Sequence, residues 1–320
     1  MGCPSSGYTR LVNVSTKTEI DAALANAQPG DQIRVAPGTY DGSTALYKSG
    51  TPSQPIVYCG VAGTNPTFQN GRFKLIASYV IITGLVFAGP SGSGNVWLAG
   101  GDHSQFIGNE VRNSDGHHGI SASDNSNLRI AYNYIHDNGA GAEIDHGIYY
   151  HQQIGTGNVI DNNLITRSTG RGISMHDSYG GVIHDILVTH NTIWRCGSTG
   201  ILLAANSGTG NVIANNIVAD NGVTYTYKQV RIKSGSPGTS VFNNIVWSPD
   251  AAKSGIEAIV GTTISGNLAQ DPKFVSPYTD LHLQAGSPAI GLGLPQYSVS
   301  PDYDGKLRDS QPDAGAFEQQ

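Results

Sequence analysis

The sequence predicts an all-β, single-domain protein that folds as a right-handed parallel β-helix, a solenoid of about 8–10 coils. A short motif repeats down the chain, an asparagine occupies the same place in most copies, and the composition disfavours long surface helices. The 320 residues include 42 glycines, and only 13% are charged. The Lys–Glu pairs of exposed helices are therefore scarce. This length fits one domain, because all-β solenoids reach it as a single unit.

The repeat consists of a small residue or asparagine followed by two or three apolar or β-branched residues. Successive copies begin 23 to 30 residues apart, which is a solenoid period with loops of variable length. An asparagine at the same point of each coil can donate to one neighbouring coil and accept from the other, so we expect a ladder. The copies begin at Gly84, Asn109, Asn133, Asn163, Asn191, Asn216, Asn244 and Asn267. We expect the six asparagines from Asn109 to Asn244 in one interior turn column.

A second motif opens the strands of one sheet. It places a polar or small residue before a glycine or glutamine, and then an isoleucine or valine that points into the stack. Its copies begin at His118, His146, Arg171, Thr199, Lys228 and Ser254. Parallel strands buried on their inner face follow from this repetition.

The two ends depart from the repeat, as caps must, because an open coil exposes unpaired backbone groups. Residues 16–28 carry a helix-like pattern, which predicts an N-terminal cap helix. From about Asp271 the ladder pattern breaks and the chain becomes rich in Pro, Gly and Asp. We interpret residues 1–270 as the β-helix with its N-terminal cap, and residues 271–320 as a C-terminal capping segment of the same domain.

Charge and hydropathy exclude several classes of partner. The formal charge is −6 and no run of Lys or Arg occurs, so we expect no nucleic-acid partner. No apolar stretch approaches the ~20 residues of a membrane span, and none resembles a signal peptide. The opening Met1-Gly2-Cys3 runs directly into mature-looking sequence. We expect a secreted, monomeric protein from which a signal peptide has been removed.

Three cysteines are too few for a zinc quartet, and none lies in a C-x-x-C pair. Cys3 and Cys59 are able to form a disulfide at the N-terminal cap, with Cys196 left free and buried. Three buried thiols are the alternative.

Several segments resemble secreted right-handed β-helix carbohydrate-active proteins, and among them the chondroitinase-B and alginate lyase group of polysaccharide lyases. The matching segments are 35–40 (VAPGTY), 50–56 (GTPSQPI), 79–85 (YVIITGL), 302–308 (DYDGKLR) and 313–318 (DAGAFE). The resemblance covers most of the chain for fold and its ends for motif. It implies an extracellular enzyme that acts on a polysaccharide.

The middle of the chain departs from that group, in which a Gly-Glu-Ala-Glu stretch supplies calcium ligands and is followed by a catalytic Lys and an Arg. Residues 141–145 (GAEID) are similar to the first stretch, so Glu143 and Asp145 are weak calcium candidates. Tyr149 and His151 stand near the expected Lys, and His176 near the expected Arg. The second matching Glu is absent, so we expect that no metal is essential. A site formed by Asp145, His146 and His151 is a lesser alternative.

Strand alternation selects the side chains that are able to meet a ligand. If Ile148 and Ile173 point inward, then Tyr149, His151 and His176 point outward. The same alternation places Arg231 and Lys233 outward on later coils. We predict that Tyr149, His151, His176 and Arg231 are catalytic. The predicted substrate-binding residues are His118, His146, Arg171, Asp177, Lys228 and Lys233.

This set fits β-elimination of a uronic-acid polysaccharide. Cations neutralise the uronate carboxylate, a base removes the C5 proton, and an acid protonates the leaving oxygen. A glycoside hydrolase would need paired carboxylates, for which Asp124, Asp145, Asp177 and Glu143 are available. A uronate C5-epimerase shares the proton abstraction, and a non-catalytic glycan-binding or adhesion β-helix is the remaining class. For each of these residues, the alternative to a catalytic or binding role is an ordinary structural role in a turn or strand.

Overall fold

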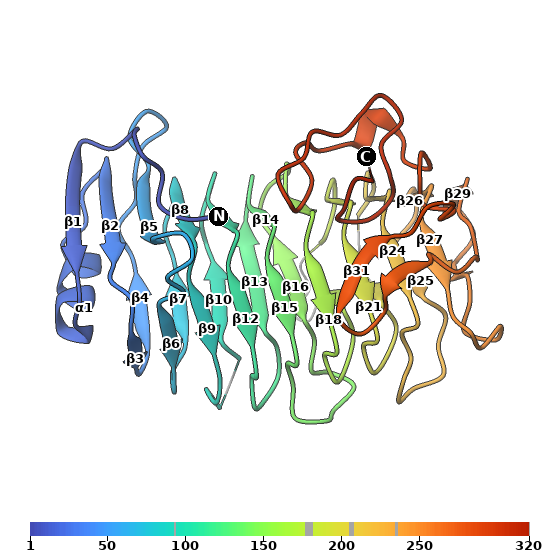
Figure 1. The fold of residues 1–320 in the computed structure, drawn as a ribbon, viewed down its shortest axis with the longest axis horizontal. Helices are drawn as coiled ribbons and strands as arrows, with labels where there is room; N and C mark the ends of the chain where they lie inside the picture. The colour runs from blue at the N-terminus through green and yellow to red at the C-terminus, as the bar shows by residue number, and fades with distance from the viewer. Residues whose placement is uncertain (93, 177–181, 205–207, 234–235, 320) are drawn as a thin grey trace.

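The chain winds into a solenoid in which each full coil contributes one strand to each of three parallel sheets (Figure 1). The computed structural model describes residues 1–319 except 93, 177–181, 205–207 and 234–235. Within these residues the three sheets contain 11, 9 and 9 strands. The prediction of an all-β parallel β-helix is confirmed.

The strands follow one another in the same order along each sheet. The first sheet consists of β1 (Arg10–Val14), β2 (Asp31–Val35), β5 (Ile56–Gly60), β8 (Val80–Thr83), β11 (Gln105–Ile107), β14 (Arg129–Ala131), β17 (Val159–Asp161), β20 (Leu187–Thr189), β23 (Val212–Ala214), β26 (Ser240–Phe242) and β29 (Thr263–Ser265). The second sheet consists of β3 (Thr39–Asp41), β6 (Thr67–Gln69), β9 (Val86–Ala88), β12 (Glu110–Arg112), β15 (Tyr134–His136), β18 (Leu164–Thr166), β21 (Thr192–Trp194), β24 (Ile217–Ala219) and β27 (Ile245–Trp247). The third sheet consists of β4 (Thr44–Leu46), β7 (Phe73–Leu75), β10 (Val96–Ala99), β13 (Ile120–Asn125), β16 (Ile148–Gln153), β19 (Ile173–His176), β22 (Ile201–Ala204), β25 (Val230–Ile232) and β28 (Ile256–Glu257).

The core is the interior of the coils, and strand alternation fills it. Along the third sheet Ile120, Ile148 and Ile173 are in register and fully buried. Two residues later Tyr150 and Met175 return to the core, as the alternation predicts. Each such side chain contributes roughly 1.5–3 kcal/mol by leaving water. Burial therefore specifies the register, because a slip of one residue would turn every core side chain outward.

The asparagine ladder runs through the turn between the first and second sheets. The Nδ2 group of Asn163 donates to Asn191 Oδ1 and to the Ile130 carbonyl, both at 2.9 Å. Its Oδ1 accepts from the backbone N–H and the Nδ2 of Asn133, at 3.0 and 2.9 Å. This coil-to-coil amide bonding continues from Asn109 to Asn267. The predicted interior column is confirmed.

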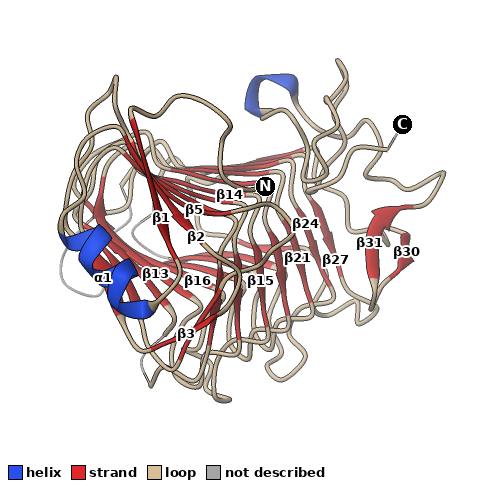
Figure 2. Cartoon of the chain, turned by 60° about the vertical axis from the view of Figure 1, so that its left-hand side comes forward, coloured by secondary structure: helices blue, strands red, loops and turns tan. Residues whose placement is uncertain are grey.

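The N-terminal end is covered by α1 (Lys17–Ala25), which lies across the first coil (Figure 2). Thr16 and Glu19 form a capping box, in which each side chain accepts from the other residue's backbone N–H. Ile20 and Leu24 are buried, so the predicted cap helix is confirmed with a shorter extent. A disulfide joins Cys3 to Cys59, and Cys196 is a buried free thiol.

The C-terminal segment lies along the outside of the second sheet, rather than across the last coil as a cap would (Figure 1). It contains the antiparallel hairpin of β30 (Phe274–Ser276) and β31 (Asp280–Leu283) and the 3-10 helix η1 (Pro295–Tyr297). Phe274 and Leu283 bury the outward-facing Trp194 and Ile217 in a second apolar cluster. The physical reason for this position is that the second sheet carries apolar side chains on its outer face here. The side chains of β29, in the last coil, remain exposed.

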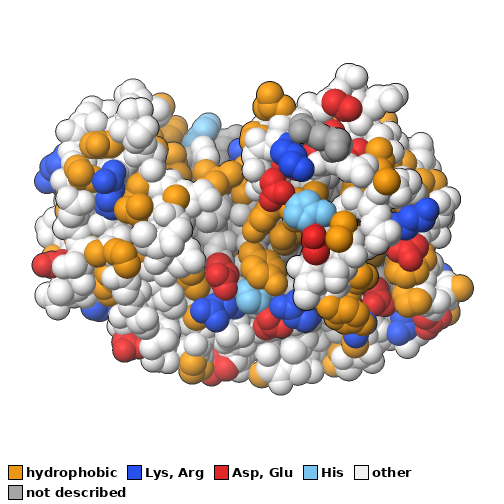
Figure 3. All heavy atoms as spheres, in the orientation of Figure 1, with side chains coloured by type: hydrophobic (Ala, Val, Ile, Leu, Met, Phe, Trp, Pro, Cys, Tyr) orange, Lys and Arg blue, Asp and Glu red, His pale blue; other side chains and the backbone are white. Residues whose placement is uncertain are grey.

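No strongly basic surface is visible on the face that carries the C-terminal segment, since Lys and Arg side chains alternate with Asp and Glu (Figure 3). Among the described residues, no helix has both the length and the apolar composition that a membrane span requires.

We predict that Asn163→Ala strongly destabilises the fold. The substitution leaves the buried Asn133 N–H and Ile130 carbonyl without the partners they have now. Each unpaired group costs about 1–3 kcal/mol, so a loss of roughly 2–5 kcal/mol in the free energy of unfolding is expected by urea denaturation. Asn267→Ala is the control. Because Asn267 is half-buried at the open end of the ladder, water can replace its bonds and the loss should be smaller. Equal losses at both positions would contradict the ladder's role.

Candidate active site

The outer face of the third sheet carries the predicted site residues. Tyr149 is in register with Ser121 on one side and Ser174 on the other. Leu202 and then Arg231 continue this column along the sheet. All of these side chains point away from the core, as the alternation predicts.

A β-bulge interrupts the pairing of β13 with β16. Ala122 pairs with Tyr150, but Ser123 pairs with Gln152, so His151 is the extra residue. A bulge re-aims the side chain that it displaces and bends its strand. Ser123, expected on the outer face, is buried as a result of this shift, whereas His151 stays half-exposed.

The site itself is a cleft of about 380 Å³ on this face, between the third sheet and the loop before β16. The residues that line it are His117, His118, Ile144, His146, Tyr149, Arg171, Ser174, His176 and Leu202. Tyr149 lies at its centre, with ring centroids 4.5 Å from His118, 5.5 Å from His146 and 5.0 Å from His151. Three imidazole rings are thus packed around one phenol.

His118 and His146 form a stacked pair on adjacent coils, with ring centroids 4.9 Å apart and planes 14° from parallel. Nδ1 of His118 accepts the backbone N–H of His146 at 3.3 Å, and Nδ1 of His146 accepts that of Arg171 at 3.3 Å. An accepting Nδ1 carries no proton, so the neutral His118 ring carries its proton on Nε2. The backbone therefore sets which nitrogen is able to donate to a ligand.

Both rings are held in the neutral form. Burial is the main reason that the pKa of His118 is lowered to about 3, with smaller electrostatic contributions from neighbours that include His117 and Arg72. Burial also lowers the pKa of His146 well below its ordinary value, with contributions from His118 and Arg171. At neutral pH the cleft therefore presents two uncharged imidazoles. They are weak bases but competent hydrogen-bond donors.

Arg171 supplies the cation of the cleft. Its Nη2 donates to Glu143 Oε1 at 2.6 Å, and Ser198 Oγ donates to the same oxygen at 3.2 Å. Its Nη1 lies 3.4 Å from Nε2 of His146. Only 15% of the Arg171 side chain is exposed, so these contacts hold the guanidinium against the neutral imidazole. Glu143 offsets part of its charge.

Asp145 has a structural role in the loop before β16. Its buried carboxylate accepts the backbone N–H groups of His117, Ala140 and Ala142, at 2.8 to 3.0 Å. These bonds occupy both of its oxygens, while Glu143 is engaged by Arg171. Across the part of the chain that the structure describes, no group of three His, Cys, Asp or Glu side chains is arranged to hold a metal ion.

The structure brings together five of the predicted residues in the cleft: Tyr149, His176, His118, His146 and Arg171. His151 stacks on Tyr149 beside the cleft but does not line it. Asp177 lies outside the described residues. The cleft is also lined by four residues that were not predicted as site residues: His117, Ile144, Ser174 and Leu202. Ser174 follows from the same alternation as Tyr149, and its buried Oγ has no hydrogen-bond partner among the described residues.

The predicted groove is shorter than expected, because Arg231 is not among the cleft-lining residues. The reason is an ion pair. Nε of Arg231 donates to Glu257 on the next coil at 2.8 Å, and the guanidinium lies 3.9 Å from the Tyr227 ring centroid. Lys233 pairs with the same carboxylate. Lys228 donates to the Ser254 carbonyl at 2.8 Å. These three cations belong to later coils.

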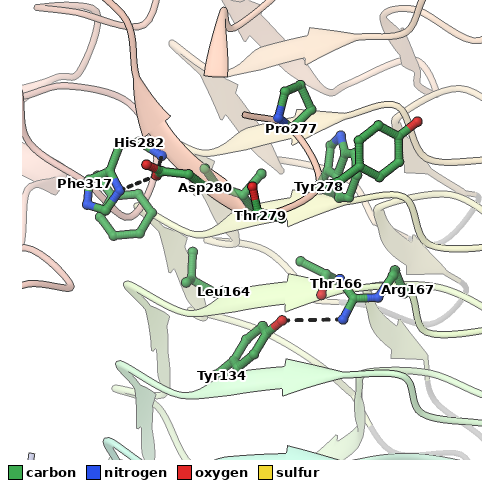
Figure 4. Close-up of a pocket in the computed structure, with 12 residues that line it drawn as sticks. Tyr134, Leu164, Thr166, Arg167, Pro277, Tyr278, Thr279, Asp280, His282 and Phe317 are labelled. Atoms are coloured by element: carbon green, nitrogen blue, oxygen red, sulfur yellow. Dashed lines mark hydrogen bonds and ion pairs between the residues drawn. The ribbon is translucent and has the colours of Figure 1, made fainter. Parts of the chain in front are cut away.

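A second cavity, of about 230 Å³, lies between the C-terminal segment and the second sheet (Figure 4). Tyr134 and Arg167 form its floor, and Tyr278 and His282 face them from the segment. Its cations are neutralised, since Arg167 pairs with Asp137, and His282 bonds both Asp280 and Asp304. Among its described lining residues, this cavity has one histidine, whereas the cleft on the third sheet has four.

Comparison with known proteins identifies the family. Residues 78–269 match the model of the right-handed β-helix region, which is more than half of the chain. The chain belongs to the right-handed β-helix family. No curated protein is a significant sequence match to this β-helix.

Solved structures share the fold of this β-helix. A pectate lyase superposes with a TM-score of 0.67 at 16% identity, covering 99% of this chain and 98% of its own. A periplasmic alginate epimerase gives 0.52 at 15% identity, covering 76% and 60%. A rhamnogalacturonan lyase gives 0.51 at 13% identity, covering 78% and 83%. At these identities the likeness shows a common fold.

We predict that this β-helix loses stability as the pH falls from about 6.5. The folded state holds the pKa of His118 near 3, whereas an unfolded histidine titrates near 6.5. Unfolding below pH 6.5 therefore takes up a proton that folding excludes, and the free energy of unfolding decreases. The window closes near pH 3, where folded His118 is protonated too. Urea midpoints measured between pH 7 and 5 avoid most carboxylate titration.

His118→Gln should reduce this pH dependence by up to about one proton. An identical slope in the unsubstituted protein and in His118→Gln would contradict the buried neutral imidazole.

Proposed function

We propose that this β-helix is a secreted polysaccharide lyase that cleaves a uronic-acid-containing chain by β-elimination at the cleft around Tyr149. The observation that carries the proposal is the composition of the cleft. A phenol, four imidazoles and a guanidinium converge on one sheet face, while no Asp or Glu is among the described lining residues. Similar folds include a pectate lyase, a rhamnogalacturonan lyase and an alginate epimerase, which supports action on a polysaccharide.

Two of the lining residues each carry out one proton transfer. His176 removes the C5 proton, because imidazole is the general base that enzymes use most often and the other two central rings are weak bases. The C5–H electron pair forms the C4–C5 double bond and the C4–O4 bond breaks. Tyr149 donates its phenolic proton to the leaving O4. The products are a free hydroxyl end and an unsaturated uronate.

Stabilisation of the carboxylate is the second requirement, since removal of the C5 proton places negative charge on that group. Arg171 provides a cation at the edge of the cleft, the Nε2–H group of His118 provides a neutral donor, and His146 lies against the guanidinium of Arg171. Donors fixed by the backbone need little reorganisation during the reaction. This assigns positioning of the acidic sugar to three of the predicted substrate-binding residues.

The residues that line the cleft also weigh against a glycoside hydrolase, but they do not separate a lyase from a C5-epimerase. A glycoside hydrolase requires two carboxylates across the scissile bond. The nearest candidates, Glu143 and Asp145, are occupied by Arg171 and by backbone N–H groups. A C5-epimerase would use the same proton abstraction and return the proton to the opposite face. The unsaturated product distinguishes a lyase from both.

Secretion is part of the proposal and is supported by the disulfide. Cys3 and Cys59 are bonded, and such bonds persist in oxidising compartments. The expected substrate is an acidic polysaccharide, and the expected catalytic unit is a monomer.

The proposal is tested with a panel of uronate polymers, including polygalacturonate, alginate and rhamnogalacturonan, followed by absorbance of the conjugated double bond. Tyr149→Phe and His176→Ala should each lower kcat by roughly 10²–10⁴, because each removes one proton transfer. His151→Ala, beside the cleft, should cost less.

Tyr278→Phe and His184→Ala are the matched controls, since both side chains are outside the cleft. Full activity of Tyr149→Phe and His176→Ala on a cleaved polymer would refute the assignment. Cleavage without the absorbance change would favour a hydrolase.

We predict that activity survives metal chelation. The carboxylates of Glu143 and Asp145 already have partners within the protein, so among the described residues no open set of oxygen ligands is arranged around the cleft. Initial rates should be equal before and after treatment with EDTA and desalting. A loss of activity that added calcium restores would show that a metal is required.

A further inference from the structure

A hollow of about 330 Å³ lies on the same face of the third sheet as the cleft around Tyr149, nearer to the N-terminus. It is formed on β4, β7 and β10, with Asp21 from the middle of α1. The residues that line it are Asp21, Ser43, Thr44, Ala45, Tyr47, Arg72, Lys74 and Trp97. The sequence motifs did not indicate this hollow.

The hollow is aligned with the cleft by the strand register. Lys74, Trp97, Ser121 and Tyr149 occupy equivalent outward positions on four successive coils. With strands about 4.8 Å apart, Trp97 lies about 10 Å and Lys74 about 14 Å from Tyr149 along the sheet. Only the small side chain of Ser121 stands between them in this column. One extended ligand is therefore able to reach both places.

The side chains of this hollow fit an acidic sugar. Nζ of Lys74 is 4.1 Å from the Trp97 ring centroid, and Cζ of Arg72 is 5.8 Å from it. Tyr47 is 59% exposed beside them. A cation over an indole is held in place while its N–H groups stay available. Aromatic faces pack against the apolar face of a sugar ring, and the cations are able to bind its carboxylate.

The charge of Lys74 is available to a ligand. Within the described ranges no carboxylate forms an ion pair with it, whereas Arg171, Arg231 and Lys233 all pair with glutamates. An anionic ligand at Lys74 therefore does not have to displace an internal partner. Asp21, the acidic residue in the lining, is paired with Lys17 on α1.

Arg72 connects the hollow to the cleft. Its Nε donates to the Gly94 carbonyl at 3.3 Å. Gly94 lies against the next coil so closely that a Cβ there would approach the His118 carbonyl oxygen to 2.6 Å. The charge of Arg72 also contributes to the low pKa of His118. The two hollows are consecutive parts of one surface.

We propose that the surface formed by Tyr47, Arg72, Lys74 and Trp97 is a remote subsite that binds an acidic sugar of the same polysaccharide chain whose scissile bond lies at Tyr149. The identity of the chain as a uronate polymer rests on the proposed function. The subsite sets the minimum length of a well-bound substrate. Oligosaccharides that end before Trp97 gain nothing from it, whereas longer chains bind more tightly.

Lys74→Met and Trp97→Ala test the subsite by affinity electrophoresis in gels that contain polygalacturonate or alginate, with neutral dextran as the uncharged polymer. Each variant should weaken binding to an acidic polymer by about tenfold. Lys273→Met, on the exposed C-terminal hairpin, removes the same charge elsewhere and should change binding little. Circular dichroism shows whether each variant is folded. Lys74→Met keeps the test informative if Trp97→Ala does not fold.

Rates on size-defined oligouronides form the second measurement. The rate on the shortest cleaved oligomer should be the same in Lys74→Met as in the unsubstituted protein, while KM for long chains should rise. Binding that weakens equally in Lys74→Met and Lys273→Met, or in neither, would overturn the subsite, as would failure of the unsubstituted protein to bind any acidic polymer. Weakened binding in Lys74→Met without an unsaturated product would support the subsite and refute the lyase.

Discussion

The in-register hydrogen bonding of each coil to the next is the constraint on which the other features depend. It sets one strand spacing for all three sheets and aligns side chains from distant parts of the sequence in straight columns. The asparagine ladder enforces it from inside, because a slipped coil would leave buried amides such as that of Asn163 without partners. The site is therefore a property of the stack. No single coil contains more than two or three of its groups.

Charge compensation decides which of the polar groups on the third sheet are able to act. Glu143 and Glu257 engage Arg171, Arg231 and Lys233, so these cations have internal partners. Burial acts in the same direction on the imidazoles, since it keeps His118 and His146 uncharged. Tyr149 and His176 remain for the proton transfers. Lys74, three coils away from Tyr149, retains its charge for a ligand.

The sequence predicted much of this arrangement because both of its repeating motifs are periodic. The ladder predicted the coil boundaries, and alternation from Ile148 and Ile173 predicted that Tyr149 and Ser174 would face outward. Alternation did not predict the β-bulge at His151, because no local motif marks the extra residue. The pairing of Arg231 was predictable in principle, since Glu257 occupies the equivalent outward position one coil later. The position of the C-terminal segment depended on the apolar outer face around Trp194 and Ile217. This face becomes visible only when the outward positions of several successive coils are compared.

The column that runs from Lys74 to Tyr149 has a consequence for how such a protein can diverge. Because every coil adds the same increment of length, the separation between the remote cations and the reacting groups is an integer number of coils. Duplication or loss of one coil between β10 and β16 would change the distance between Lys74 and Tyr149 by one strand spacing. The geometry around each of these two residues would stay intact. Substrate length can thus change in whole steps during evolution without any redesign of the catalytic groups.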